Sequence, residues 1–409
     1  MTMKKLTLSL LMFLSYAIAT QAQWITLTSG TTSDLTSVFF TSPDTGYAVG
    51  LDGTIIKTVN GGTSWAPQSS GVSFILNDVF FINSNTGYIA GAQGTILKTT
   101  NGGALWTPLT TGTTDVIRSV YFVNENVGYA VGGYNVGGVI FKTTNGGNTW
   151  TEQTSNYNYW LNDVYFVNEN VGFASGGESI NGKMLKTTDG GLSWTIQTLP
   201  TNYAMNSTYF ANANTGFAVG NSGEILKTIN GGNNWEQVSS GTGNVLYGMT
   251  FIPKGTSEMG FAVGWNGTIR TTSDGGETWT SQTSGTTKLL KAICFANQNA
   301  TYTGYIVGET GKILKNTFQN VGFAEPEMAM SSLIVFPNPA SDVITISALE
   351  NKKTFSSIDI YNNIGEIVMA MPYEKSVSSY NITSLPNGIY TLKFVNNSQN
   401  EVIRFVIQR

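Results

Sequence analysis

The hydrophobic pattern of the chain repeats every 41 to 44 residues between residues 24 and 319, and each repeat alternates short apolar runs with turn residues. In the second repeat the apolar runs are 76–81, 86–91 and 95–100, and Trp106 begins a fourth. Runs of this length, rich in β-branched and aromatic residues and bounded by Gly and Asn, predict β-strands. Four short antiparallel strands per repeat predict a β-propeller blade. A ladder of single-strand coils is disfavoured, because it would need only one turn signal per repeat.

Six repeats end in a hairpin with the pattern T-x-[ND]-G-G-x-x-W, called here the box hairpin. Its Gly and Asn residues tolerate the positive φ angles that a tight turn needs. The Asn or Asp side chain is expected to cap backbone N–H groups, while the Trp packs between strands. We therefore interpret the box residues as structural: Asn60, Trp65, Asn101, Trp106, Asn145, Trp150, Asp189, Trp194, Asn230, Trp235, Asp274 and Trp279.

The seventh repeat has no box hairpin and no fourth strand, since Asn316-Thr317-Phe318 stands where the box should begin. The chain starts, however, with an extra fourth strand at 24–30, led by Trp24. We predict that this strand completes the last blade, which would leave no incomplete sheet edge. The alternative is a self-contained last blade in which Phe323 replaces the Trp. The expected fold is all-β: a seven-bladed β-propeller followed by a small C-terminal β-sandwich.

Composition narrows the possible functions. Lys and Arg number 21 against 25 Asp and Glu, a net charge of −4, which argues against a nucleic-acid partner. The absence of His excludes Ser-His-Asp and Cys-His nucleophilic sites and imidazole metal sites. The single cysteine, Cys294, is interpreted as a buried apolar side chain. No cofactor or metal site is predicted, although calcium bound by Asp and backbone oxygens stays open.

The two ends of the chain carry targeting signals. Residues 1–22 combine Lys4 and Lys5 with an apolar stretch and small residues, as in a secretory signal peptide. A membrane anchor is the alternative, but the apolar run is short for a span, and no later segment predicts one. The expected domains are a signal peptide at 1–22, the propeller at 23–319, a linker at 320–332 and a second β domain at 333–409.

Specific motifs support two family resemblances. The box hairpin is similar to the Asp-box of sialidase-like propellers, and the repeat with T-G-[YF]-A-V-G resembles the photosystem II assembly factor family of propellers. The tail resembles the type A C-terminal sorting domain of the type IX secretion system of Bacteroidetes, through F-P-N-P-A, Y-N-x-x-G-E and L-P-N-G-I-Y. The residues that carry this likeness are Pro337, Asn338, Pro339, Gly365, Gly388 and Tyr390. The likeness implies export through the periplasm by the type IX machinery, with secretion or attachment at the outer-membrane surface.

A further pattern marks the face opposite the box hairpins. One position near the start of each first strand is polar in all seven repeats: Thr36, Asn77, Arg118, Asn162, Asn206, Tyr247 and Lys291. These positions are expected to line the mouth of the central channel, either as a ligand rim or simply as a solvated surface. Aromatic residues in the adjoining loops suit stacking on a sugar or peptide. The predicted ligand-binding residues are Asn77, Arg118, Trp160, Asn162, Tyr203, Asn206, Tyr247, Trp265 and Lys291.

No catalytic residue is assigned. A sialidase site needs three arginines, and residues 23–320 contain only Arg118 and Arg270. Glycoside hydrolysis stays an alternative if two carboxylates face each other at about 5–10 Å, the candidates being Asp78, Asp163, Glu178 and Glu224. We expect a secreted or cell-surface binding propeller that recognises glycan or protein. The other alternative is a purely structural surface or matrix protein.

Overall fold

The computed structural model describes residues 23–134, 137–254, 257–298, 301–319, 333–336, 340–348, 357–362, 366–372, 378–395, 401–407 and 409. The chain divides into two compact units, Met1–Val321 and Gly322–Arg409. The predicted signal peptide at 1–22 and linker at 320–332 lie outside the described residues.

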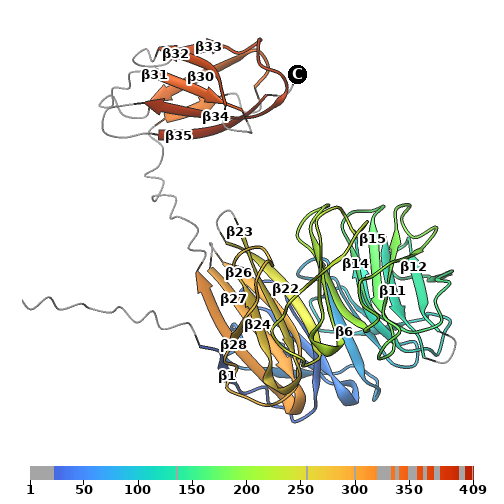
Figure 1. The fold of residues 1–409 in the computed structure, drawn as a ribbon. Coiled ribbons are helices and arrows are strands. Elements are labelled where there is room, and N and C mark those ends of the chain that lie inside the picture. Colours follow the sequence, from blue (N-terminus) through green and yellow to red (C-terminus); the bar gives the residue numbers. More distant parts are fainter. Residues whose placement is uncertain are drawn as a thin grey trace, which may run out of the picture. The chain divides into compact units, whose positions relative to one another are not determined.

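The first unit is a ring of seven four-stranded antiparallel sheets (Figure 1). Blade 1 contains β2 (Leu35–Phe40), β3 (Gly46–Gly50), β4 (Ile55–Thr58) and β5 (Ala66–Gln68). Blade 2 contains β6 (Leu76–Phe81), β7 (Gly87–Gly91), β8 (Ile96–Thr99) and β9 (Thr107–Leu109). Blade 3 contains β10 (Ile117–Phe122), β11 (Gly128–Gly132), β12 (Val139–Thr143) and β13 (Thr151–Gln153).

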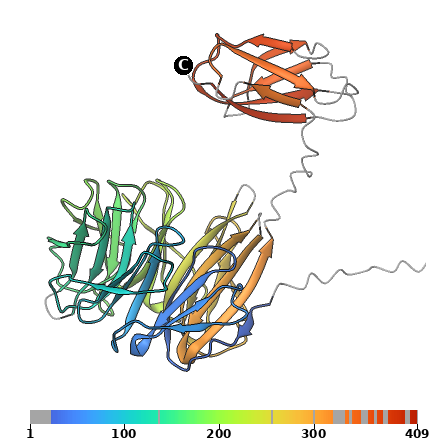
Figure 2. The same cartoon turned by 180° about the vertical axis from the view of Figure 1, so that it is seen from behind.

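The remaining blades follow in chain order around the ring (Figure 2). Blade 4 contains β14 (Leu161–Phe166), β15 (Gly172–Gly176), β16 (Lys183–Thr187) and β17 (Thr195–Gln197). Blade 5 contains β18 (Met205–Phe210), β19 (Gly216–Gly220), β20 (Ile225–Thr228) and β21 (Glu236–Val238). Blade 6 contains β22 (Leu246–Lys254), β23 (Ser257–Gly264), β24 (Ile269–Thr272) and β25 (Thr280–Gln282). Single 3-10 turns join the second and third strands of four blades: η1 (Leu51–Gly53), η2 (Asn221–Gly223), η3 (Trp265–Gly267) and η4 (Glu309–Gly311).

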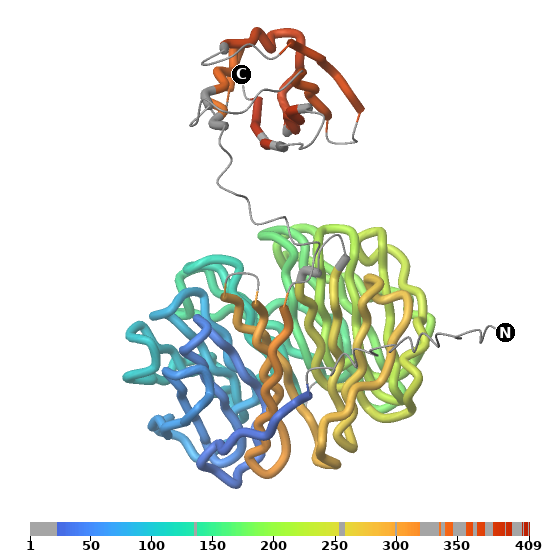
Figure 3. Tube along the Cα trace, turned by 90° about the vertical axis from the view of Figure 1, so that its left-hand side faces the viewer, coloured from blue at the N-terminus to red at the C-terminus, as the bar shows by residue number. Residues whose placement is uncertain are grey.

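Blade 7 is completed by the N-terminal strand, as predicted. It contains β26 (Leu290–Gln298), β27 (Thr301–Gly308) and β28 (Lys312–Gln319), and its fourth strand is β1 (Ile25–Leu27). β1 pairs with β28, so that Ile25 lies opposite Lys315. The dark-blue β1 lies against the orange β28 (Figure 3). Trp24 is buried, and its indole N–H donates to Gln282 Oε1 of blade 6 at 3.0 Å. The edge of β28 that the alternative assigned to a strand at Phe323 is thus taken by β1, and Phe323 itself lies outside the described residues.

Neighbouring blades pack through their apolar faces. The first strands contact one another around the whole ring, from β2 through β6, β10, β14, β18, β22 and β26 back to β2. Each blade interface holds a cluster of buried aliphatic and aromatic side chains. In every blade a glycine of the second strand lies opposite the phenylalanine that ends the common part of the first strand and makes room for its ring; a Cβ on Gly87 would lie 2.6 Å from the Phe81 ring. The recurring glycine is thus a packing requirement.

The box hairpin is held by its own side chains and by the preceding blade. In the first box, Asn60 Oδ1 accepts from the Ser64 N–H at 3.0 Å, and Thr58 Oγ1 accepts from the Gly62 N–H at 2.9 Å. In the second, the Gly102 carbonyl accepts from both Tyr47 Oη and Lys57 Nζ of blade 1, each at 2.7 Å. Such bonds tie one blade to the next.

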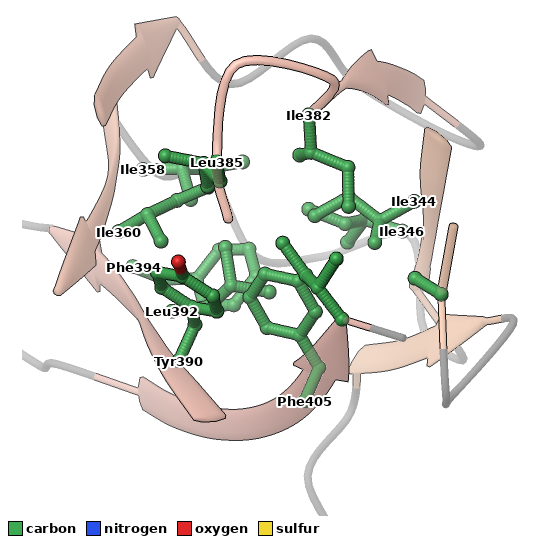
Figure 4. Close-up of a cluster of buried hydrophobic side chains, with 12 residues drawn as sticks. Ile344, Ile346, Ile358, Ile360, Ile382, Leu385, Tyr390, Leu392, Phe394 and Phe405 are labelled. Atoms are coloured by element: carbon green, nitrogen blue, oxygen red, sulfur yellow. The ribbon is translucent and has the colours of Figure 1, made fainter. Parts of the chain in front are cut away.

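The second unit packs two antiparallel sheets around one core. The sheets contain β29 (Leu333–Phe336), β30 (Val343–Ala348) and β33 (Ser378–Asn381) in one, and β31 (Ser357–Tyr361), β32 (Ile367–Pro372), β34 (Gly388–Val395) and β35 (Glu401–Ile407) in the other. Ile344 and Ile346 from the first sheet meet Phe394 and Phe405 from the second (Figure 4). This arrangement is the predicted C-terminal β-sandwich.

The described part of the tail includes two of the six predicted sorting residues. Gly388 begins β34, and Tyr390 is buried, with its hydroxyl donating to Pro386 O at 2.8 Å. Pro337, Asn338, Pro339 and Gly365 lie outside the described residues. The terminal Arg409 donates to Leu385 O at 2.7 Å and Ile382 O at 2.8 Å, so the end of the chain is held against the L-P-N-G turn. Among the described residues, no helix has the length and hydropathy of a membrane span.

Candidate functional site

A β-bulge occurs at the same place in all seven first strands. In blade 2, Leu76 pairs with Gly91 and Asp78 with Ala90, which leaves Asn77 without an opposite residue on β7. The same shift occurs in every other blade. The glycine that ends the second strand permits it, because a Cβ on Gly91 would lie 2.6 Å from Ile75 O. Bulges redirect side chains next to functional sites, and here the bulged residues are the seven polar positions predicted from the sequence.

These bulged residues surround one cavity of about 510 Å³ at the mouth of the channel. Seven of the nine predicted ligand-binding residues line it: Asn77, Arg118, Trp160, Asn162, Asn206, Tyr247 and Lys291. The other two, Tyr203 and Trp265, do not line it, and their side chains are exposed. The volume lies within the range of small-ligand sites.

The asparagines of this ring already have structural partners. Asn77 Nδ2 donates to Ile117 O at 2.8 Å, and Asn162 Nδ2 donates to Met205 O at 3.0 Å, each acceptor being in the next blade. Asn206 Nδ2 donates to Leu246 O at 2.9 Å in the same way. The ring therefore joins blades as well as lining the cavity, and the asparagines have fewer donors to offer a ligand than the sequence suggested.

Two cations of the ring lie over aromatic rings. The guanidinium carbon of Arg118 lies 4.9 Å from the centroid of Trp160, and Lys291 Nζ lies 4.0 Å from the centroid of Tyr247. These distances are within the range of cation–π contacts. Burial lowers the pKa of Arg118. Burial, together with the positive charge of Arg118, lowers the pKa of Lys291 to about 8.

Neither cation has an acidic partner. In the part of the chain that the structure describes, no carboxylate oxygen lies within 4.0 Å of Arg118 or Lys291. The Arg118 Nε–H is buried and has no hydrogen-bond acceptor among those residues. Partly buried cations are normally paired, because removing a charge from water is costly.

Two carboxylates lie one residue further along their strands. Asp78 accepts from Ser37 Oγ of blade 1 at 2.9 Å and from the Val120 N–H of blade 3 at 3.0 Å. The arrangement recurs in blade 4, where Asp163 accepts from Ser119 Oγ of blade 3 at 3.0 Å and from the Thr208 N–H of blade 5 at 2.7 Å. Burial raises the pKa of both groups, that of Asp163 to about 6, with the charge of Asp78 adding to the shift. Each carboxylate thus bridges three consecutive blades.

The other two acidic candidates differ in position. Glu178 lines the cavity and is exposed. Glu224 does not line it, is buried, and accepts from Gln237 Nε2 at 2.8 Å. No group of three or more metal-ligating side chains occurs among the described residues.

Aromatic residues of the loop at 156–160 divide into two groups. Trp160 lines the cavity, whereas Tyr157 is buried and its hydroxyl donates to Asn181 O. Tyr134 is exposed, and its ring lies parallel to that of Trp160 with centroids 6.5 Å apart. Trp160 is therefore flanked by Arg118 and Tyr134.

Comparison with known proteins identifies the propeller. The family described as photosynthesis system II assembly factor YCF48 matches residues 16–110, 69–154 and 155–248, which together span more than half of the chain. The chain belongs to the YCF48 family. A second family, the secretion system C-terminal sorting domain, matches residues 334–408, so the protein carries the tail of an exported protein. A search of functionally curated proteins found no match.

Solved structures agree with the YCF48 fold. The structure titled "YCF48 bound to D1 peptide" is similar with a TM-score of 0.60 and 20% identity, covering 72% of this chain and 94% of that one. The structure of YCF48 from Cyanidioschyzon merolae has a TM-score of 0.59 and 20% sequence identity, covering 72% of this chain and 98% of that one. An ancestral GH74 enzyme has a TM-score of 0.58 and 13% sequence identity, covering 93% of this chain and 63% of that one. At these identities the likeness concerns the fold alone.

Sequence reasoning missed three serines, each of which directly follows a residue of the polar ring. Ser37 and Ser119 donate to the two buried aspartates, and Ser207 takes the equivalent position in blade 5. The signal was present in the sequence: the residue after the polar ring position alternates Ser, Asp, Ser, Asp, Ser in the first five repeats. Cys294, expected as a buried apolar side chain, is partly buried against the core cluster between blades 7 and 1.

Proposed function

We propose that this protein is an exported binding propeller whose ligand, a glycan or a segment of protein, occupies the channel-mouth cavity. The observation that carries the proposal is the convergence of seven bulged side chains on one cavity, where two cations without acidic partners are held over aromatic rings. A related propeller of the family was solved with a peptide bound, which supports a protein ligand.

Export is the part of the function that the tail supports. The sorting domain implies contact with the secretion machinery and a secreted or cell-surface location. We propose that residues 1–22 direct the chain to the periplasm and that the tail then takes it across the outer membrane, as in the type IX route. Deleting residues 333–409 should leave the protein in the periplasm. Normal export of the truncated chain would refute this assignment.

Polysaccharide hydrolysis is the second candidate. Asp163 lines the cavity with its pKa raised to about 6 by burial, which is a suitable range for a general acid. Against this role, its oxygens accept hydrogen bonds from Ser119 and Thr208, so that Asp163 links neighbouring blades. A purely structural surface or matrix protein, the remaining alternative, would neither bind a glycan or peptide nor hydrolyse a polysaccharide.

One experiment separates these functions. The mature chain, residues 23–409, is applied to a glycan array and a peptide array, and a panel of polysaccharides is incubated with it and assayed for new reducing ends. Binding without new reducing ends supports the binding propeller. Turnover that Asp163→Asn abolishes would support the hydrolase instead, and no binding to either array would favour the structural protein.

A further inference from the structure

We propose that the channel mouth recognises a carboxylate group of a peptide, with Arg118 and Lys291 as the two groups that bind it. This inference rests on the binding function proposed above and names the chemistry of its ligand. The two residues belong to blades 3 and 7, and both line the same cavity.

The first argument concerns charge. Arg118 and Lys291 are close enough for the charge of one to lower the pKa of the other. Two like charges in a partly buried site repel each other, and no described carboxylate pairs with either. An anion bound between them would remove this repulsion and give the Arg118 Nε–H an acceptor. A carboxylate suits the site because the guanidinium fork can bind both of its oxygens.

The second argument concerns the aromatic rings. A sugar-binding site offers open aromatic faces, but Trp160 lies under the Arg118 guanidinium and Tyr247 lies under the Lys291 ammonium group. Each ring therefore stabilises a cation and fixes its position. This arrangement favours an anionic peptide over a sugar ring stacked on the same residues.

The third argument concerns the carboxylates of the cavity. The other charged groups of the cavity are Asp78, Asp163 and Glu178. Asp78 and Asp163 lie one residue further along their strands and are held by Ser37 and Ser119. Ionised aspartates there would repel an anion that moved toward them. A carboxylate is thus favoured beside Arg118 and Lys291, as when the end of a peptide chain or an acidic side chain enters the mouth.

The test uses the mature chain, residues 23–409, immobilised and incubated with a randomised pentapeptide mixture. One arm carries free C-terminal carboxylates, a second carries C-terminal amides, and a third is an oligogalacturonate, which supplies carboxylates on sugars. Retained molecules are identified by mass spectrometry and their Kd values measured by calorimetry. We expect retention of free-acid peptides, and from the amide arm only peptides that contain Asp or Glu.

Variants then assign the binding to the two cations. Arg118→Gln and Lys291→Met should each weaken binding about 10- to 100-fold, since hydrogen bonds to charged groups contribute about 1.5–3 kcal/mol. Arg118→Lys should recover part of the loss, because it keeps the charge without the fork. Lys312→Met is the matched control: it removes the same charge from the same blade outside the cavity, and its Kd should stay unchanged. Thermal melting checks that each variant is folded.

The outcomes are distinguishable. Retention of amidated peptides that lack acidic side chains as strongly as free acids, or binding that survives both cation variants, would overturn the carboxylate assignment and leave the binding function standing. Retention of oligogalacturonate alone would overturn the peptide source. No retention in any arm would overturn both this inference and the proposed peptide-binding function.

Discussion

Lys315 Nζ lies 2.7 Å from the carbonyl oxygen of Gly61, a residue 254 positions earlier in the chain. The same carbonyl accepts from Tyr305 Oη at 2.9 Å. This pair of bonds joins blade 7 to the box hairpin of blade 1 and repeats the arrangement of Tyr47 and Lys57 on Gly102. The ring is therefore closed by the same contact that links its successive blades.

Blade 6 lacks the lysine of this contact. Thr271 occupies the lysine position, and its Oγ1 donates to Gly260 O within the blade. Blade 7, which follows it, has no box hairpin to receive such bonds. The lysine of each repeat is thus present where the next blade offers a box carbonyl.

Replacing Lys315 should weaken ring closure. We expect Lys315→Met to lower the free energy of unfolding by about 1–3 kcal/mol, the usual effect of losing a hydrogen bond from a charged donor. Urea denaturation of the mature chain measures it. Lys57→Met, which removes the equivalent bond between blades 1 and 2, should have a similar effect. An unchanged midpoint for Lys315→Met would show that the closing bond contributes nothing to stability.

Trp24 should be a major contributor to blade 7. Its ring is buried, so Trp24→Ala should cost about 3–5 kcal/mol of unfolding free energy. Ile25→Ala is the control, because that side chain is 55% exposed and its loss should cost little. Deleting residues 23–30 should expose the edge of β28 and cause oligomers in size-exclusion chromatography. A stable, monomeric deletion variant would contradict closure by β1.

The two buried aspartates should make stability depend on pH. Burial raises the folded-state pKa of Asp163 to about 6, above the unfolded value near 3.8, so between these values the folded state binds more protons. Stability should therefore fall as pH rises from about 4 to 6. Asp78→Ser should lower the pKa of Asp163, because the Asp78 charge contributes to the shift. NMR titration of the Asp163 carboxyl checks this, and an unchanged pKa would mean that the two groups do not interact.

Lys291 should make carboxylate binding depend on pH in the alkaline range. Burial holds its pKa at about 8, with Arg118 adding to the shift, so it loses its charge as pH rises through that value. Kd for an acidic peptide should rise between pH 7 and 9, and Lys291→Met should remove this dependence. Folding stability should increase from about pH 8 to 10.5, since the unfolded chain binds more protons there. A Kd that stays constant from pH 7 to 9 would contradict a role for the Lys291 charge.

The fold was largely predictable because its determinants are local. Strand length, turn residues and the interval between Trp residues are properties of short segments, and they predicted the blades. The missing fourth strand of the last repeat and the extra strand at Trp24 predicted closure, since only a paired edge satisfies the backbone donors and acceptors of β28.

The site depended on contacts that sequence order does not show. Aligning the repeats found Arg118 and Lys291, but their placement in one cavity over Trp160 and Tyr247 results from bulges and ring closure. The asparagines were expected to face a ligand, and their amide groups instead bond to carbonyl groups of the next blade. The sequence by itself determined the seven blades, the closing strand and the polar ring. Only the tertiary structure decided which ring residues are already bonded and which charges lack partners, because those depend on distances between blades.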